Sequence, residues 1–266
     1  MNTLALNPVA DTTSRIIAPP VLSAYLAEMR CEFARTLRNP AIALPVLVMP
    51  VAIYLLFAVV IFGEAAVKDP SLGIYLFGAF SIMGVTMPAL FGISAGLAVD
   101  REMGVLRLKR AQPAPVGAWL VAKIAAGVAF GLLAYLPILT VAVLTGKLAL
   151  GASALAAMSA ALIAGAIPFC ALGLMVGALV KGSAAPGYAN LIYLPGCYLS
   201  GMFFPLPKSM HWQAPLWPQF HVEQLAMHAA GVTKFQFMPV QMAIATLIGF
   251  TAVFGAVAYW RLSSKG

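Results

Sequence analysis

The stretch 100–113 concentrates chemistry that is rare elsewhere in this chain. Six charged residues occur in it, although charged residues make up only 9% of the sequence: Asp100, Arg101, Glu102, Arg107, Lys109 and Arg110. The acids come first and the cations last, as the dipole of a short helix favours. Long apolar segments lie on both sides, and so dense a group of charges cannot lie in a bilayer. The pattern predicts a segment outside the membrane that another protein can bind.

A second set of reactive groups, His221, Glu223 and His228, contains side chains that bind metals. The two histidines are seven residues apart, which is not the H-E-x-x-H spacing that brings two imidazoles and a base to zinc. Catalysis by a membrane enzyme is therefore disfavoured against polar residues at a helix rim. The three cysteines are scattered, without the paired spacing of a metal site or a disulfide framework.

The sequence also lacks the motif that binds the phosphates of ATP. A phosphate-binding loop needs G-x-x-x-x-G-K followed by Ser or Thr, and neither Gly146-Lys147-Leu148 nor Lys181-Gly182-Ser183 completes it. The sequence predicts no catalytic, cofactor or metal site on this chain, so any energy from ATP must come from a separate polypeptide.

Composition determines which elements carry these residues. Hydrophobic residues make up 62% of the 266 residues and the mean hydropathy is +0.95, well above the roughly 45–50% apolar content of soluble domains. An all-α integral membrane protein is expected, because the long uninterrupted apolar segments exclude the alternating strands of a barrel. Six transmembrane helices are predicted, at about 41–62, 72–99, 116–145, 152–180, 188–204 and 239–260.

Basic residues set the expected orientation. With the N-terminus in the cytoplasm, only Lys68, Lys147, Lys208 and Lys234 lie outside, and the other 12 of the 16 Lys and Arg residues lie inside. Both termini are predicted to be cytoplasmic, with residues 1–20 a tail that has no signal-peptide core. Topology and contact with anionic membrane lipids explain the net charge of +8, so no nucleic-acid partner is expected.

Residues 21–39 predict an amphipathic helix on the inner leaflet. Its apolar face comprises Leu22, Tyr25, Leu26, Met29, Phe33 and Leu37. The polar residues Glu28, Cys31, Arg35 and Arg38 lie opposite, and Asn39-Pro40 ends the helix. A simple membrane anchor remains the alternative.

Glycine pairs with four-residue spacing predict close helix packing, either inside one subunit or at a dimer seam. They are Gly92 and Gly96, Gly127 and Gly131, and Gly173 and Gly177.

Three motifs resemble the type-2 ABC transporter permeases (the ABC-2 family, or type V exporters). Asp100-Arg101-Glu102-Met103-Gly104-Val105-Leu106, followed by Pro113, is similar to the E-R-E-x-G-T-L loop after the second membrane helix of that family. Ser200-Gly201-Met202-Phe203-Phe204-Pro205-Leu206 resembles its S-G-x-x-F-P-L turn, and Arg38-Asn39-Pro40 the end of its amphipathic helix. The departures are Asp100 for Glu, Val105 for Thr, Lys109 for an apolar residue and Gln112 for Thr.

The resemblance implies a permease domain at 40–262 and a partnership. Two permeases, identical or homologous, would form the pathway, and two cytoplasmic ATPase subunits, which bind ATP and Mg, would drive it from a bacterial inner membrane. The ATPase-coupling positions carried over, on the interface helix and the loop 100–115, are Glu28, Arg35, Arg38, Asp100, Arg101, Glu102, Gly104, Leu106, Arg107 and Arg110. Short re-entrant helices are expected at 205–237, with Ser200, Gly201, Phe204, Pro205, Pro218 and Glu223 as positions of the external turn and re-entrant segment.

The expected function is export of a lipid, a lipid-linked glycan or a hydrophobic drug-like compound. The alternative is an ion-coupled secondary transporter or channel, which commonly holds an ionisable group within the membrane. None of the eight acids is central to a predicted span, and Glu223 is expected on the external side.

Overall fold

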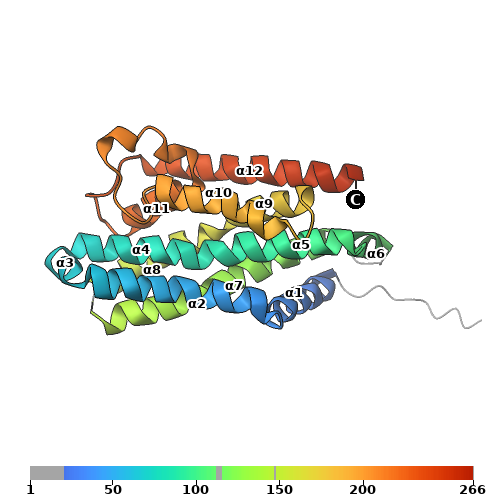
Figure 1. The fold of residues 1–266 in the computed structure, drawn as a ribbon, viewed down its shortest axis with the longest axis horizontal. Helices are drawn as coiled ribbons and strands as arrows, with labels where there is room; N and C mark the ends of the chain where they lie inside the picture. The colour runs from blue at the N-terminus through green and yellow to red at the C-terminus, as the bar shows by residue number, and fades with distance from the viewer. Residues whose placement is uncertain (1–20, 112–115, 147, 266) are drawn as a thin grey trace, which may run out of the picture.

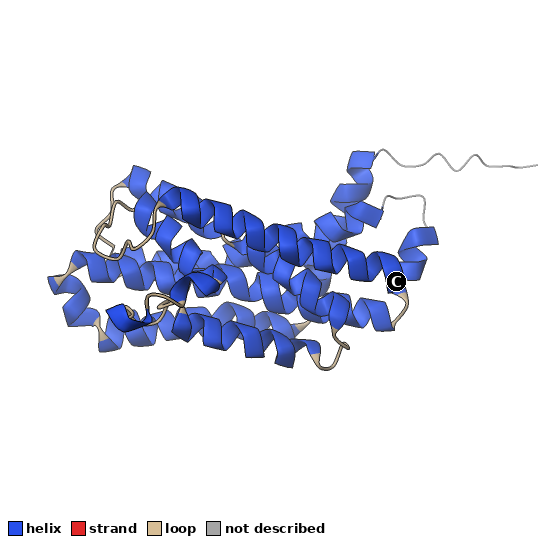
Figure 2. Cartoon of the chain, turned by 90° about the horizontal axis from the view of Figure 1, so that it is seen from above, coloured by secondary structure: helices blue, strands red, loops and turns tan. Residues whose placement is uncertain are grey.

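The computed structural model describes residues 21–111, 116–146 and 148–265. Every regular element in these ranges is a helix, and most helices run along the long axis of the bundle, with connections at its two ends (Figures 1 and 2). The predicted tail 1–20 and positions 112–115 of the loop lie outside the described residues. The all-α class predicted from the sequence is confirmed.

Five stretches of the described residues are long and apolar enough to cross a membrane. They are Ala43–Ile61, Pro70–Glu102, Gly117–Leu144, Ala152–Leu179 and Val240–Ser264. The predicted fifth span at 188–204 is instead α10 (Ala185–Leu199), a helix of 15 residues. At 1.5 Å per residue it is about 22 Å long, short of the ~30 Å hydrocarbon core. Among the described residues, the six predicted spans thus correspond to five candidate spans and this shorter apolar helix.

Three of the spans are interrupted. The first joins α2 (Pro40–Tyr54) to a π-helical stretch, Leu55–Ile61. The second joins α4 (Pro70–Met87) to α5 (Ile93–Glu102) through π-helical Pro88–Gly92, because Pro88 has no N–H for the helical ladder. The fourth breaks at Gly165 between α8 (Ala152–Ala164) and α9 (Ala166–Leu179).

The segment 205–237, predicted to lie outside, folds back against the bundle. It contains 3₁₀ turns at Lys208–Met210 and Ala214–Leu216, followed by α11 (Pro218–Ala229). Helix α11 packs between α4, α8 and α12 (Val240–Lys265), and the short helix α3 (Gly63–Lys68) lies at the same end of the bundle (Figure 1). Val222 on α11 lies so close to Gly165 that a Cβ there would be 2.4 Å from it. The break in the fourth span therefore accommodates α11.

Two of the three glycine pairs lie where helix backbones nearly touch. A Cβ at Gly131 on α7 (Val116–Leu144) would be 2.8 Å from the Val85 carbonyl oxygen, and one at Gly177 would be 2.8 Å from that of Ser94. A Cβ at Gly92 would meet no described atom within 4 Å, so Gly92 is not a close-packing position inside this subunit.

Candidate functional site

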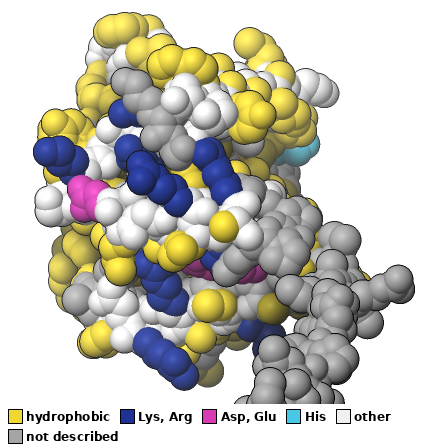
Figure 3. Space-filling view, turned by 90° about the vertical axis from the view of Figure 1, so that its right-hand side faces the viewer, with side chains coloured by type: hydrophobic (Ala, Val, Ile, Leu, Met, Phe, Trp, Pro, Cys, Tyr) yellow, Lys and Arg dark blue, Asp and Glu magenta, His cyan; other side chains and the backbone are white. Residues whose placement is uncertain are grey.

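The predicted coupling residues converge at one end of the bundle. This end, called here the charged face, comprises α1 (Val21–Leu37), the turn from α5 into α6 (Val105–Ala111) and the last turns of α12 (Figure 1). Lysine and arginine side chains are spread over it (Figure 3). All ten residues carried over as coupling positions belong to α1, α5, α6 or the turns that follow α1 and α5.

A buried ion network lies at the centre of the charged face. Asp100, which is fully buried, holds its Oδ1 2.5 Å from Arg35 of α1 and its Oδ2 2.7 Å from Lys123 of α7. Lys123 also donates to both carboxylate oxygens of Glu32 at 3.0 Å. Asp100 and Lys123 are buried and Glu32 is nearly so, while Arg35 reaches the network from the surface. Two acids and two bases thus neutralise one another, as buried charges require. The network fastens α1, α5 and α7 together.

The surroundings of α1 differ from the single apolar face predicted for it. Glu28 is paired with Lys109 of α6, and Phe33 packs on Phe130 of α7 with ring centroids 4.8 Å apart. Leu22 and Leu26 are exposed. Acidic and aromatic residues of α1 therefore contact the bundle, while its leucines remain available to lipid. Glu28 and Arg35, expected on the polar side of the helix, pair with Lys109 of α6 and Asp100 of α5.

The turn after α5 is tied to the ends of two other spans. Arg101 donates to the carbonyl oxygens of Gly177 and Val180 at 2.8 and 3.3 Å, and Glu102 accepts the Gly182 N–H at 3.0 Å. Arg110 donates to the Leu262 carbonyl oxygen at 2.9 Å. Movement of this turn is thereby linked to α9 and α12.

Gly104 makes the turn itself with a left-handed backbone (φ 72°), a conformation that favours glycine. Leu106 is buried and anchors α6, whereas Met103, Arg107 and Leu108 are exposed. Arg38, one residue beyond α1, is exposed as well. The charged face thus presents a projecting knob, Met103, Arg107 and Leu108, above an internally paired base.

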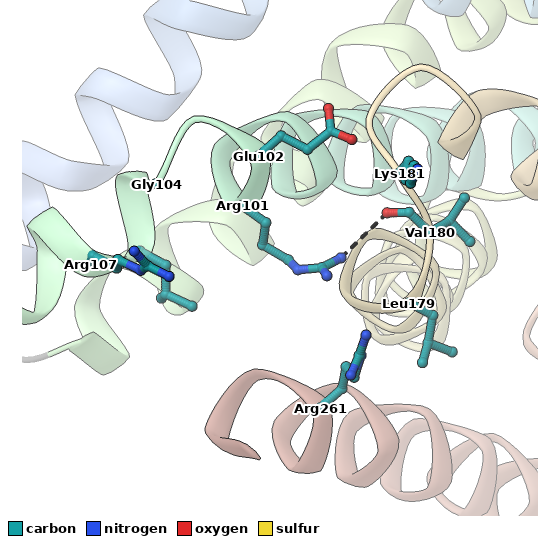
Figure 4. A pocket seen from close by; sticks show the side chains of 9 residues that line it. Arg101, Glu102, Gly104, Arg107, Leu179, Val180, Lys181 and Arg261 are labelled. Atoms are coloured by element: carbon teal, nitrogen blue, oxygen red, sulfur yellow. Dashed lines mark hydrogen bonds between the residues drawn. The ribbon is translucent and has the colours of Figure 1, made fainter. Parts of the chain in front are cut away.

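A cavity of about 450 Å³ opens beside the turn, and Figure 4 shows its lining. Its charged residues are Arg101, Glu102, Arg107, Lys181 and Arg261. They come from α5, α6, the link after α9, and α12. This cavity is strongly cationic.

A family model described as ABC-2 type transporter matches residues 24–229. The chain belongs to the ABC-2 type transporter family. It is therefore a permease subunit of an ABC transporter and a multi-pass membrane protein, in a family whose domain carries no ATP-binding cassette of its own. A search of curated proteins found no match. The resemblance seen in the three sequence motifs is confirmed.

Sequence reasoning about this ABC-2 permease missed Glu32 and Lys123. The available signal was a lysine inside a predicted span, since Lys123 lies seven residues beyond its expected start at 116. Such a charge requires a partner. The partners come from helices distant in sequence, so the motif at 100–106 alone did not reveal them.

At the opposite end of the permease, the turn at 200–204, predicted to be external, is held by long-range contacts. Gly201 has φ 84°, and its carbonyl oxygen accepts a hydrogen bond from the Tyr75 hydroxyl. Phe204 packs edge-on against Phe57, and Ser200 is buried. Pro205 lies in the following loop, and Pro218 begins α11.

The nearby ion pair between Asp69 and Lys234 joins the start of α4 to the segment after α11. Lys234 Nζ lies 2.5 Å from Asp69 Oδ2, and its hydrogen bond lowers the pKa of Asp69. The Asp69 side chain also accepts the Ser71 N–H at 3.1 Å and so caps α4.

Glu223 lies deeper than predicted. A Cβ at Gly78 would be 3.1 Å from its Oε1, and Gly78 is eight residues, or about 12 Å, along α4 from Pro70. Both carboxylate oxygens are buried without a hydrogen-bond partner among the described residues, and burial raises the pKa of Glu223 well above its usual range. No span contains Glu223, in keeping with the expectation from the sequence, but α11 carries its carboxylate inward to lie beside α4.

The two histidines on α11 do not face a common metal site. His221 Nε2 lies 2.8 Å from the Pro215 carbonyl oxygen, while His228 is exposed. Across the described ranges, no group of three His, Cys, Asp or Glu side chains is placed to hold a metal ion.

Proposed function

We propose that this permease is driven by two cytoplasmic ATPase subunits that dock on the charged face, together with a second permease that is identical or homologous. ATP and Mg bind on the ATPase. The membrane is a bacterial inner membrane, with both termini in the cytoplasm. The transported compound is a lipid, a lipid-linked glycan or a hydrophobic drug-like molecule, moved outward.

The distribution of cations along the bundle supports this orientation. Arg101, Arg107, Lys181 and Arg261 line one cavity on the charged face. At the other end, Lys234 is neutralised by Asp69. Cytoplasmic ends of membrane proteins carry the excess of Lys and Arg.

The observation that carries the proposal is the buried network between Asp100, Arg35 and Lys123. Because the knob is exposed at its tip and bonded to neighbouring helices at its base, a push on it moves those helices and does not deform the knob. ATPase closure on Met103, Arg107 and Leu108 would displace α5 and α6. Through the network, α1 and α7 would move with them, which tilts spans between two discrete states.

An apolar groove of about 470 Å³ supports the substrate class. It lies between α8–α9 and α12 and includes Ile167, Pro168, Leu247 and Ile248. Such a groove suits an acyl chain or another hydrophobic group.

The test places a charge on the knob. Leu108→Glu should reduce the ATPase subunit that co-purifies with the permease at least tenfold, because an acid on a docking surface costs desolvation. Leu216→Glu at the opposite end is a matched control, since both leucines are 65% exposed. Equal recovery of the ATPase with both variants would contradict docking at the knob.

Glu223 is the one observation that favours the alternative, an ion-coupled transporter or channel. A buried carboxyl beside a span is the kind of group that carries a coupling proton. Under this alternative, Glu223→Gln abolishes uptake or efflux driven by a pH gradient, and no ATPase co-purifies with the permease.

A further inference from the structure

The cationic cavity beside the α5–α6 turn has more charge than its own contacts neutralise. Arg101, Arg107, Lys181 and Arg261 face a single acid, Glu102, which already accepts the Gly182 N–H. Arg101 and Arg261 extend toward the same space from α5 and α12, where their like charges repel (Figure 4). An anionic ligand would relieve this repulsion.

Hydrogen-bond donors in the cavity also lack acceptors. The buried Nε of Arg261 has no partner among the described residues. Arg101 uses only one terminal nitrogen for its two carbonyl bonds, although a guanidinium carries five N–H donors. A phosphate group offers several acceptor oxygens in the geometry that arginine matches. The unmet donors therefore point to a phosphate.

The position of the cavity near the ends of the spans favours the phosphate of a lipid over other anions. Arg101, Leu179 and Arg261 each lie within one turn of the end of a span. Tyr259 and Trp260, next to Arg261, are exposed on α12, as aromatic residues at the level of lipid headgroups commonly are. Leu179 is exposed and supplies an apolar wall on the membrane side of the cavity. The knob formed by Met103, Arg107 and Leu108 comes after the end of the second span in the chain, so ATPase docking there leaves the inner part of the cavity to lipid.

From these observations we infer that the cavity between α5–α6, the link after α9, and the end of α12 is a binding site for the phosphate headgroup of an anionic phospholipid. Basic pockets between membrane helices are a recurring means of holding such headgroups. The site does not depend on the proposed function, since it requires neither an ATPase nor a particular substrate.

The test is native mass spectrometry of the full chain, purified in detergent with any subunits that accompany it. Phosphatidylglycerol and phosphatidylcholine with the same acyl chains are titrated separately. The wild type should bind phosphatidylglycerol more tightly, and Arg261→Gln should weaken that binding about fivefold, the usual contribution of one cation near an anionic lipid. Phosphatidylcholine binding should not change.

Two further variants control for misfolding and for the loss of a positive charge outside the cavity. Lys181→Gln removes an exposed charge at the rim and should weaken phosphatidylglycerol binding even if Arg261→Gln misfolds. Arg30→Gln, exposed on α1 outside the cavity, should leave it unchanged.

Three results would overturn the assignment. The first is equal binding of phosphatidylglycerol by the wild type and Arg261→Gln. The second is displacement of the lipid by millimolar inorganic phosphate, which would indicate a site for free anions. The third is loss of an accompanying ATPase subunit from Arg261→Gln with lipid binding unchanged, which would assign the cavity to an acidic side chain of that subunit.

Discussion

Removing Lys123 should destabilise the permease far more than removing an exposed lysine. Lys123→Met leaves fully buried Asp100 with Arg35 alone and deprives Glu32 of its partner. Breaking a buried ion pair from one side costs about 3–5 kcal/mol, and the remaining Arg35 contact points to the lower end, about 3 kcal/mol. At roughly 2–4 °C for each kcal/mol, the unfolding midpoint should fall by about 6–12 °C.

The assay is thermal unfolding of purified protein in detergent, followed by tryptophan fluorescence. Lys208→Met, an exposed lysine at the other end, is the control and should change the midpoint by less than about 2 °C. In an Asp100→Asn background, Lys123→Met should cost about 2 kcal/mol less, because the fully buried carboxylate of Asp100 is no longer there to lose a partner and only Glu32 does so. If Lys123→Met costs the same in both backgrounds, the two side chains are not energetically coupled and the network argument fails.

Three other outcomes are expected. Glu223→Gln should flatten the pH dependence of the unfolding midpoint between pH 5 and 8. Burial raises the pKa of Glu223 in the folded state, so the wild type loses stability as pH rises above the pKa of the unfolded state. Parallel pH profiles of the wild type and the variant would contradict this reasoning. Gly131→Ala should destabilise the fold by about 1–3 kcal/mol through contact with the Val85 carbonyl, whereas Gly249→Ala, with open space around it, should be neutral or stabilising; the comparison of the two midpoints decides. Cysteines placed at Ser209 and Ser183, both exposed, should react with impermeant maleimide in intact cells only at position 209, and labelling at 183 would reverse the proposed orientation.

The spans were predictable because crossing a bilayer requires a minimum apolar length, which can be counted along a sequence. The segment at 188–204 met that count only by including the turn at Ser200 and Gly201, where the helix has already ended. Apolar composition continues through this turn, so hydropathy could not locate the end.

The site was partly predictable for a different reason. The charge pattern at 100–113 predicted one short helix with its acids at the start, whereas Asp100, Arg101 and Glu102 form the last turn of α5 and only the later cations lie in α6. The family motif did single out these three residues, and the structure gives each a specific partner. Lys123 and Glu32 depend on tertiary contacts between helices about 90 residues apart. Re-entrant helices were expected at 205–237 from the family resemblance, but the position of Glu223 beside α4 depends on how α11 packs between the spans, which no local pattern encodes.

The central claim is that a separate ATPase works through the charged face of this permease. Its most direct test is gentle purification of the tagged protein from its native membrane, identification of accompanying chains by mass spectrometry, and measurement of ATP hydrolysis. We expect an ATP-binding subunit in equal stoichiometry and hydrolysis inhibited by vanadate. A permease recovered alone and without ATPase activity, under conditions that preserve membrane complexes, would contradict it.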